Sequence, residues 1–194
     1  MASDPPDRAR IVVCDPDPAW ALTFARLRDA IAPALEGVAL AIEHVGSTAV
    51  PGLAAKPVID MDVVVEQGAG VARAVRALEG LGYVHRGDLG IAGREAFRAP
   101  PELPRHHLYV CVQGCAALRN HLAVRDHLRA HPEQARAYGE LKRELARVHA
   151  FDMDAYVEGK SAFLQRVLRA SGFDAEELER IERANAREQP GARD

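Results

Sequence analysis

The chain has 194 residues, of which 48% are hydrophobic, so it is long enough and apolar enough to bury a real core. Its formal net charge of −3 argues against general nucleic-acid binding, although a local basic cleft is compatible with it. No apolar run approaches the length of a membrane helix, the three cysteines form no even disulfide framework, and no signal-peptide pattern is present at the start, so we expect a cytoplasmic protein with no membrane partner.

The first third of the chain predicts a helix and two strands. Residues 1–10 predict a disordered tail. Asp17-Pro18 predicts a helix start, and apolar residues then recur at helical spacing to about Leu35. Trp20 in this helix is expected to pack in the core. The elements that follow are a strand over 40–45, a turn at Gly46-Ser47, a loop over 48–57 and a strand over 58–65.

The rest of the chain predicts a further strand region and then only helices. In order, the patterns indicate a helix over 71–81, short strands over 83–97, a proline-rich loop over 100–104, a strand over 107–112, three helices that end near His131, Val148 and Gly172, and a charged helix over 176–187. We therefore expect an α/β (α+β) part over 11–114, a helical layer over 115–172 packed on it, and a charged C-terminal helix or tail over 173–194.

Two aspartates in the second strand are the strongest signal of chemistry. Side chains alternate along a strand, so Asp60 and Asp62 share one face while Met61 takes the other. Two carboxylates separated by about 6.6 Å of strand repel each other unless a proton, a cationic partner or a metal ion relieves the repulsion. We favour a divalent metal. The alternative is an edge strand whose solvent face carries both acids.

The Gly46-Ser47 turn precedes this strand and suits a phosphate. Glycine lets the backbone approach a ligand, the following N–H groups can point at phosphate oxygens, and Ser47 adds a hydroxyl donor. Lys56, just before the acid strand, is a further candidate for phosphate. A Gly-Ser dipeptide is also a common turn, and Lys56 is equally compatible with a surface position.

Basic residues later in the chain are further candidates. Arg94 and Arg98 follow a glycine-rich turn and offer fork-shaped donors to phosphate, with a solvated charged face as the alternative. By alternation His107 points away from His106, and it enters the site if its strand is a neighbour of the acid strand. The alternative for His107 is a structural role.

Two other groups of residues are also candidates for a functional site. Cys111 and Cys115 lack the paired spacing of a zinc site, so zinc is not expected. Polar residues on the helix after Gly114 either line a cleft or form an exposed, internally paired face: Arg119, His121, Arg125 and Asp126.

Residues 42–62, IEHVGSTAVPGLAAKPVIDMD, closely resemble the signature of the GrpB family. That family belongs to the nucleotidyltransferase superfamily with the DNA polymerase β type of catalytic core, and a similar domain is fused to some dephospho-CoA kinases. The resemblance runs from about residue 11 to 170, with further matches at Asp15-Pro16, Trp20, Gly82-Tyr83, 87–91, 105–108 and 125–129. It implies a nucleotidyltransferase-like core over 11–114, with a small mixed sheet flanked by helices.

The resemblance also implies roles for the turn and the acids. Gly46 and Ser47 would hold the triphosphate of an NTP, and Asp60 and Asp62 would bind Mg²⁺, with Mn²⁺ as a possible substitute. Typical superfamily members carry a third acid on a later strand.

The corresponding strand of this chain, over 107–112, contains no acid. Three explanations are open: His107 replaces the third acid, Glu95 or Asp88 reaches the site, or catalysis has been lost.

The leading interpretation is a Mg²⁺-dependent nucleotidyltransferase that uses an NTP and modifies a hydroxyl of an unknown small molecule or protein. The expected catalytic residues are Asp60, Asp62 and His107, and the expected nucleotide-binding residues are Gly46, Ser47, Lys56, Arg94 and Arg98. One alternative is a non-catalytic module that binds a nucleotide or a CoA-related ligand. A third reading, a structural partner domain, predicts an exposed apolar patch.

Overall fold

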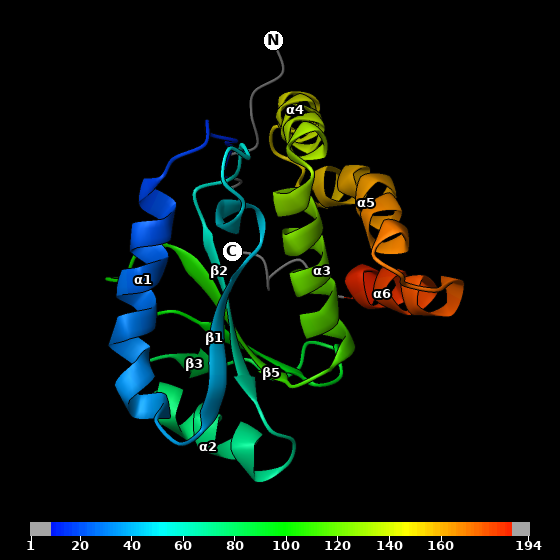
Figure 1. The fold of residues 1–194 in the computed structure, drawn as a ribbon. Helices are drawn as coiled ribbons and strands as arrows, with labels where there is room; N and C mark the ends of the chain where they lie inside the picture. Colours follow the sequence, from blue (N-terminus) through cyan, green and yellow to red (C-terminus); the bar gives the residue numbers. More distant parts are fainter. Residues whose placement is uncertain (1–8, 188–194) are drawn as a thin grey trace.

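A mixed five-stranded sheet forms the centre of the protein (Figure 1). The computed structural model describes residues 9–187. The strands are β1 (Ala39–Val45), β2 (Ile59–Val65), β3 (Val84–His85), β4 (Arg94–Arg98) and β5 (His106–Val112), in the spatial order β1-β2-β5-β4-β3. Strands β2 and β5 are parallel, and the other neighbouring pairs are antiparallel.

Helices cover the two faces of the sheet in different ways (Figure 1). One face packs against α1 (Ala19–Ile31), its 3₁₀ continuation η1 (Ala32–Leu35) and α2 (Ala69–Gly80). The other face meets α3 (Ala116–Ala130), beyond which lie α4 (Pro132–Val148), α5 (Met153–Ala170) and α6 (Ala175–Arg187). This arrangement confirms the expected α/β fold with a C-terminal helical layer.

The main core lies between the sheet and α1 and α2. Met61 and Val63 of β2 are fully buried there, and Leu108 of the neighbouring β5 joins them. Trp20 of α1 belongs to the same cluster, as expected. Because every second residue of β2 points into this apolar layer, Asp60 and Asp62 point to the opposite face.

A second cluster ties the helical layer to the loop that follows Gly46-Ser47. Leu53 of that loop packs with Leu128 of α3 and Tyr138 of α4. At Gly139 of α4, a Cβ atom would lie 3.5 Å from the backbone nitrogen of Ala54, an ordinary van der Waals distance, so α4 packs directly against the loop. Helix α4 is thereby held next to the turn η2 (Ser47–Ala49).

The expected elements occur within a few residues of their predicted bounds, with small corrections. Helix α1 begins after Pro18, and Asp17 accepts a hydrogen bond from the backbone of Ala19 (2.8 Å) without being the cap residue. Val148, expected on the apolar stripe of α4, is 56% exposed, because the helix ends there. Most of the expected tail, residues 1–8, and the C-terminal residues 188–194 lie outside the described residues.

No helix among residues 9–187 is long and apolar enough to cross a membrane.

Candidate functional site

The acid pair lies at the centre of the sheet, on the face that meets α3. Asp62 is fully buried, whereas the Asp60 side chain keeps 30% of its surface exposed. Strand β2 has neighbours on both sides, so the pair is not on an edge strand. This removes the alternative in which both acids simply face solvent from a sheet edge.

The structure brings the Gly46-Ser47 turn into contact with Asp60. Gly46 has φ of +69°, a conformation that favours glycine, and a Cβ atom at this position would lie 2.1 Å from Oδ2 of Asp60. Only glycine fits between the end of β1 and this carboxylate. The close approach puts the turn and the first aspartate on one small surface.

Each aspartate is paired with a histidine. The Nδ1–H of His107 donates to Oδ1 of Asp60, and the Nδ1–H of His121 donates to Oδ2 of Asp62, both at 2.8 Å. Asp60 is opposite His107 in the parallel register of β2 and β5, which fulfils the condition set for His107 by the sequence. His121 comes from α3.

One member of each pair has a shifted pKa. Burial would raise the pKa of Asp60, but the hydrogen bond and charge of His107, followed by His121 and Lys56, outweigh it and lower the pKa. Burial would lower the pKa of His121, but the charge and hydrogen bond of Asp62 raise it overall. The site therefore favours an ionised Asp60 and a cationic His121.

Two buried polar atoms of these pairs lack a hydrogen-bond partner among the described residues. They are Oδ1 of Asp62 and Nε2 of His107. A buried polar atom without a partner is costly, so such atoms are rare in structures and require an explanation, such as a catalytic role or a bound water or ion. One orphaned atom belongs to each Asp–His pair.

Lys142 of α4 contacts the Gly46-Ser47 turn, and the sequence interpretation did not include it. It is 2% exposed, its Nζ donates to Oγ of Ser47 at 2.8 Å, and it lies 4.6 Å above the ring of Tyr138. Burial first, then the charge of Lys160, lower its pKa well below the usual range, although Asp60 acts in the opposite direction. The signal that could have identified it is helical spacing, which puts Lys142 on the buried face of α4 with Ala135, Tyr138 and Ala146.

Helix α3 fixes the turn through two arginines. Arg125 donates to Oε2 of Glu43 at 2.7 Å and to the carbonyl of His44 at 3.1 Å. Arg129 donates twice to the carbonyl of Ala49, at 3.0 and 2.8 Å. Glu43 is opposite Asp62 in the β1–β2 register, so a third carboxylate does lie on this face, on a strand where the sequence analysis did not seek one.

The polar residues predicted on the α3 surface divide between two surroundings. His121 and Arg125 face the acid site, as described above. Asp126 pairs with Arg125 at 2.7 Å, and Arg119 pairs with Glu177 of α6 at the same distance. Half of the group therefore faces the acid pair, and the other half forms ion pairs on the helix surface.

The cations predicted for the nucleotide occupy three different places. The charge of Lys56 helps to lower the pKa of Asp60, and its Nζ lies 3.7 Å from Sδ of Met153. Arg94 is buried and lies 4.5 Å above the ring of Tyr109. Arg98 is exposed on β4, two strands away from β2, and lines a groove beside His107.

Neither acid proposed to replace the missing third carboxylate points to the site. Glu95 accepts a hydrogen bond from His85 of β3 at 2.7 Å, and by alternation it shares the face of Phe97. Asp88 accepts from the backbone of Gly90 at 2.9 Å in an exposed turn. Of the alternatives left open by the sequence, His107 replacing the acid and loss of catalysis are still open.

The donor set fits a magnesium–nucleotide complex better than a metal held by protein alone. Among residues 9–187, no three His, Cys, Asp or Glu side chains gather as a metal site. Mg²⁺ is usually bound by one or two carboxylates, with substrate phosphates and water completing its shell. The orphaned Oδ1 of Asp62, together with Asp60 against the turn, supplies that partial shell.

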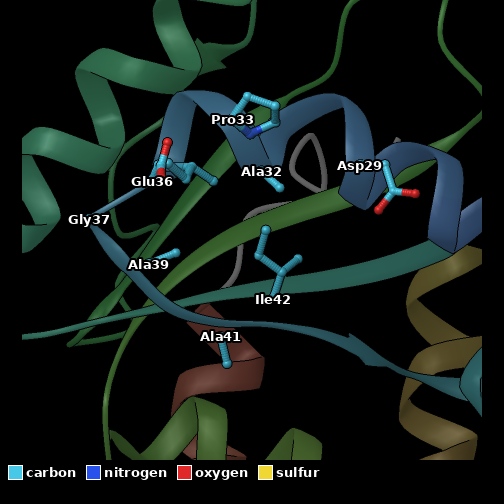
Figure 2. A pocket seen from close by; sticks show the side chains of 9 residues that line it. Asp29, Ala32, Pro33, Glu36, Gly37, Ala39, Ala41 and Ile42 are labelled. Atoms are coloured by element: carbon cyan, nitrogen blue, oxygen red, sulfur yellow. The ribbon is translucent and has the colours of Figure 1, made fainter.

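A separate surface pocket of about 480 Å³ lies between the end of α1, η1 and β1 (Figure 2). Figure 2 shows small apolar side chains, including Ala32, Pro33 and Ala41, around it. Its charged lining residues are Asp29 and Glu36, and it contains no member of the acid site. We therefore do not assign the chemistry to it.

Comparisons with known proteins match most of this chain. The model of the family described as "GrpB protein" matches residues 10–170. The crystal structure of the conserved protein GrpB from Enterococcus faecalis superposes with a TM-score of 0.73 and 34% identity, covering 88% of this chain and 99% of that one.

Two curated relatives are bacterial proteins whose names state no activity. The UPF0157 protein PA4798 of Pseudomonas aeruginosa is 43% identical over 164 residues, covering 84% of this chain and 68% of that protein. The UPF0157 protein YqkA of Bacillus subtilis is 36% identical over 146 residues, covering 75% of this chain. The matched part is only 43% of YqkA, so this chain spans less than half of that relative.

Proposed function

The chain belongs to the GrpB family, and we propose that it is a Mg²⁺-dependent nucleotidyltransferase that transfers a nucleotidyl group from an NTP to a hydroxyl. One observation carries this proposal above the others. The carboxylate of Asp60 is packed against the Gly46-Ser47 turn while Asp62, on the same face, keeps a buried oxygen without a partner. A phosphate turn and carboxylates for a divalent ion therefore share one surface, as an NTP–Mg²⁺ complex requires.

We assign the triphosphate to the Gly46-Ser47 turn and to the lysine side chains near it. Ser47 offers its hydroxyl, and Lys142 is hydrogen-bonded to that hydroxyl from α4. Lys56 adds positive charge near Asp60. We further propose that Arg94, which lies above the ring of Tyr109, balances negative charge near Asp62. Bound Mg²⁺ would neutralise phosphate charge and align the reacting groups.

His107 is the proposed general base. Because Asp60 accepts the Nδ1 proton, the neutral imidazole presents a lone pair at Nε2, the atom without a partner. The acceptor oxygen attacks the α-phosphorus and loses its proton to Nε2. The bond between the α-phosphorus and the bridging oxygen breaks, and pyrophosphate leaves with the bonding electrons. His107 thus takes the part of the missing third acid.

A second candidate is a nucleotide-binding or CoA-related ligand-binding module without transfer activity. The observation that favours it is the pairing of both aspartates with histidines, which occupies one oxygen of each carboxylate. The acid-free strand β5 is consistent with it as well.

Calorimetry with ATP in the presence of Mg²⁺ tests the shared part of both candidates. Wild-type protein is expected to bind, and Asp62→Asn is expected to weaken binding at least about 30-fold, because losing one carboxylate charge from a metal–phosphate site costs about 2 kcal/mol or more. Asp29→Asn, an exposed acid on α1, is the matched control and should bind as wild type. Absence of Mg²⁺-dependent ATP binding by the wild type contradicts the transferase and a nucleotide-binding module, and leaves only a module for a CoA-related ligand.

Transfer distinguishes the two candidates. The protein is incubated with ATP labelled at the α-phosphate, Mg²⁺ and a metabolite extract. A labelled adduct with equimolar pyrophosphate, lost in His107→Asn while ATP binding is retained, supports the enzyme. Binding without adduct or pyrophosphate supports the module.

A further inference from the structure

A groove of about 350 Å³ extends from His107 across the side of the sheet away from Gly46-Ser47. Residues of β4 and β5, the segment after β3 and the proline-rich loop before β5 line it. Three arginines from separate segments contribute to the lining: Arg86, Arg98 and Arg105. His107 lines the groove and also pairs with Asp60, so the groove lies beside this pair.

The charge of this groove is not compensated within the described chain. No Asp or Glu is among its lining residues. Arg86, Arg98 and Arg105 are exposed, and none of the three makes an ion pair or side-chain hydrogen bond with another of residues 9–187. Guanidinium groups that line one groove repel one another, and a polyvalent anion relieves that repulsion with fork-shaped hydrogen bonds.

A second basic pocket provides a useful contrast. It has a volume of about 500 Å³, lies between α3 and α6, and is also lined by arginines. There, however, Arg119 pairs with Glu177 at 2.7 Å and Arg183 pairs with Glu179 at 3.0 Å. Two of its arginines already have acidic partners, whereas none of the three groove arginines has one among residues 9–187, so the groove at His107 is the stronger anion site.

We infer that the groove binds the acceptor substrate, a small alcohol that carries a phosphate group. The phosphate lies among Arg86, Arg98 and Arg105, and the hydroxyl reaches Nε2 of His107. Three uncompensated positive charges match a phosphate dianion better than a single carboxylate. This inference rests on the proposed transferase function. It assigns Arg98 to the acceptor site instead of the nucleotide site.

Glycerol 3-phosphate is the probe, and glycerol is its neutral match. Both are titrated into the full chain while the histidine and arginine side-chain NMR signals are followed. Saturable shifts of His107 and the groove arginines are expected with glycerol 3-phosphate but not with glycerol. No saturable shift at millimolar glycerol 3-phosphate overturns the inference.

The matched variants are the double substitution Arg98→Gln and Arg105→Gln, and the single substitution Arg136→Gln on the exposed surface of α4. The double variant is expected to weaken glycerol 3-phosphate binding at least about tenfold, since each charged hydrogen-bonded contact contributes on the order of a factor of ten. It should leave Mg²⁺–ATP binding unchanged, and Arg136→Gln should change neither.

The outcomes separate the two proposals. If Mg²⁺–ATP fails to bind but glycerol 3-phosphate binding still depends on the arginines, the transferase proposal fails and the phosphate site stands. If Mg²⁺–ATP binds and the double variant binds glycerol 3-phosphate as tightly as wild type, the acceptor site is overturned and the transferase proposal stands.

Discussion

The two faces of the sheet use histidine in opposite ways. On the face covered by α1 and α2, His44 stacks on Phe24 with ring centroids 4.5 Å apart, and burial lowers its pKa to about 4. On the face that meets α3, the charge and hydrogen bond of Asp62 outweigh burial and raise the pKa of His121. The same side chain is thus held neutral on one face and favoured as a cation on the other.

This contrast between histidines separates those that serve the core from those that belong to the candidate site. His106 follows the first pattern: its Nδ1–H donates to the carbonyl of Pro104 at 2.7 Å, Tyr83 Oη lies 2.9 Å from its Nε2, and burial lowers its pKa. Its neighbour His107 pairs with Asp60 instead, and its buried Nε2 has no hydrogen-bond partner among the described residues. One step along a strand therefore separates a histidine whose two ring nitrogens are both hydrogen-bonded from one that keeps a ring nitrogen without a partner.

The largest effect is expected from the apolar face of β2. Met61, which lies between the two aspartates in the sequence, is fully buried. Met61→Ala should lower the free energy of unfolding by about 4 kcal/mol, because apolar burial is lost and a cavity forms. Urea unfolding measures this loss. Under conditions where the variant is folded, Mg²⁺–ATP affinity should match wild type, so a strong loss of affinity would mean that the two faces are not independent.

A pH effect on stability is expected from His44. Its pKa of about 4 in the folded chain is below the ordinary histidine value of 6.5, so between these two pH values the unfolded chain binds the proton first. Stability is therefore full above pH 6.5 and falls as the pH drops toward 4, by up to about 3 kcal/mol from this group.

Thermal unfolding across that pH range measures the effect. His44→Gln keeps a polar group near Thr48, the present partner of the ring at 3.1 Å, but cannot titrate. The slope of stability against pH should be smaller in this variant. An unchanged slope would assign the effect to other groups.

The turn is expected to fail when its glycine is replaced. Gly46→Ala must adopt a positive φ and place a methyl group against Asp60, so we expect a loss of about 2 kcal/mol in the free energy of unfolding and a weaker Mg²⁺–ATP complex. Gly37→Ala is the matched control, because that glycine also has a positive φ, of +66°, but no atom lies within 4 Å of its added Cβ. Similar nucleotide affinity in the two variants would contradict the role of the close approach.

The smallest effect is expected at Lys142 and has the opposite sign. Burial lowers the pKa of this amine well below its usual range, so the folded state gains by its removal. Lys142→Met should raise the free energy of unfolding by about 1 kcal/mol while weakening Mg²⁺–ATP binding, as expected where a site trades stability for function. Lys160→Met, on α5, is the comparison variant. A Lys142→Met protein that is less stable and binds ATP normally would show that the amine is purely structural.

Much of the fold was predictable from local patterns. Alternation along residues 58–65 was sufficient to place Asp60 and Asp62 on one face, because a strand has a period of two whatever surrounds it. Helical periodicity located the C-terminal helices for a similar reason, and both rules depend only on neighbours in the sequence. The positive φ of Gly46 agrees with a turn that the dipeptide Gly-Ser suggested.

The partners of these residues were decided by tertiary structure alone. The sequence could not show that β2 and β5 are adjacent, and this pairing is what brings His107 to Asp60 across 47 residues. His121 reaches Asp62 over 59 residues, and Lys142 reaches Ser47 over 95. Such contacts depend on how the helical layer packs on the sheet, which no local periodicity encodes. The sequence by itself therefore determined which side chains share a face, and only the packing of distant segments decided which charges meet there.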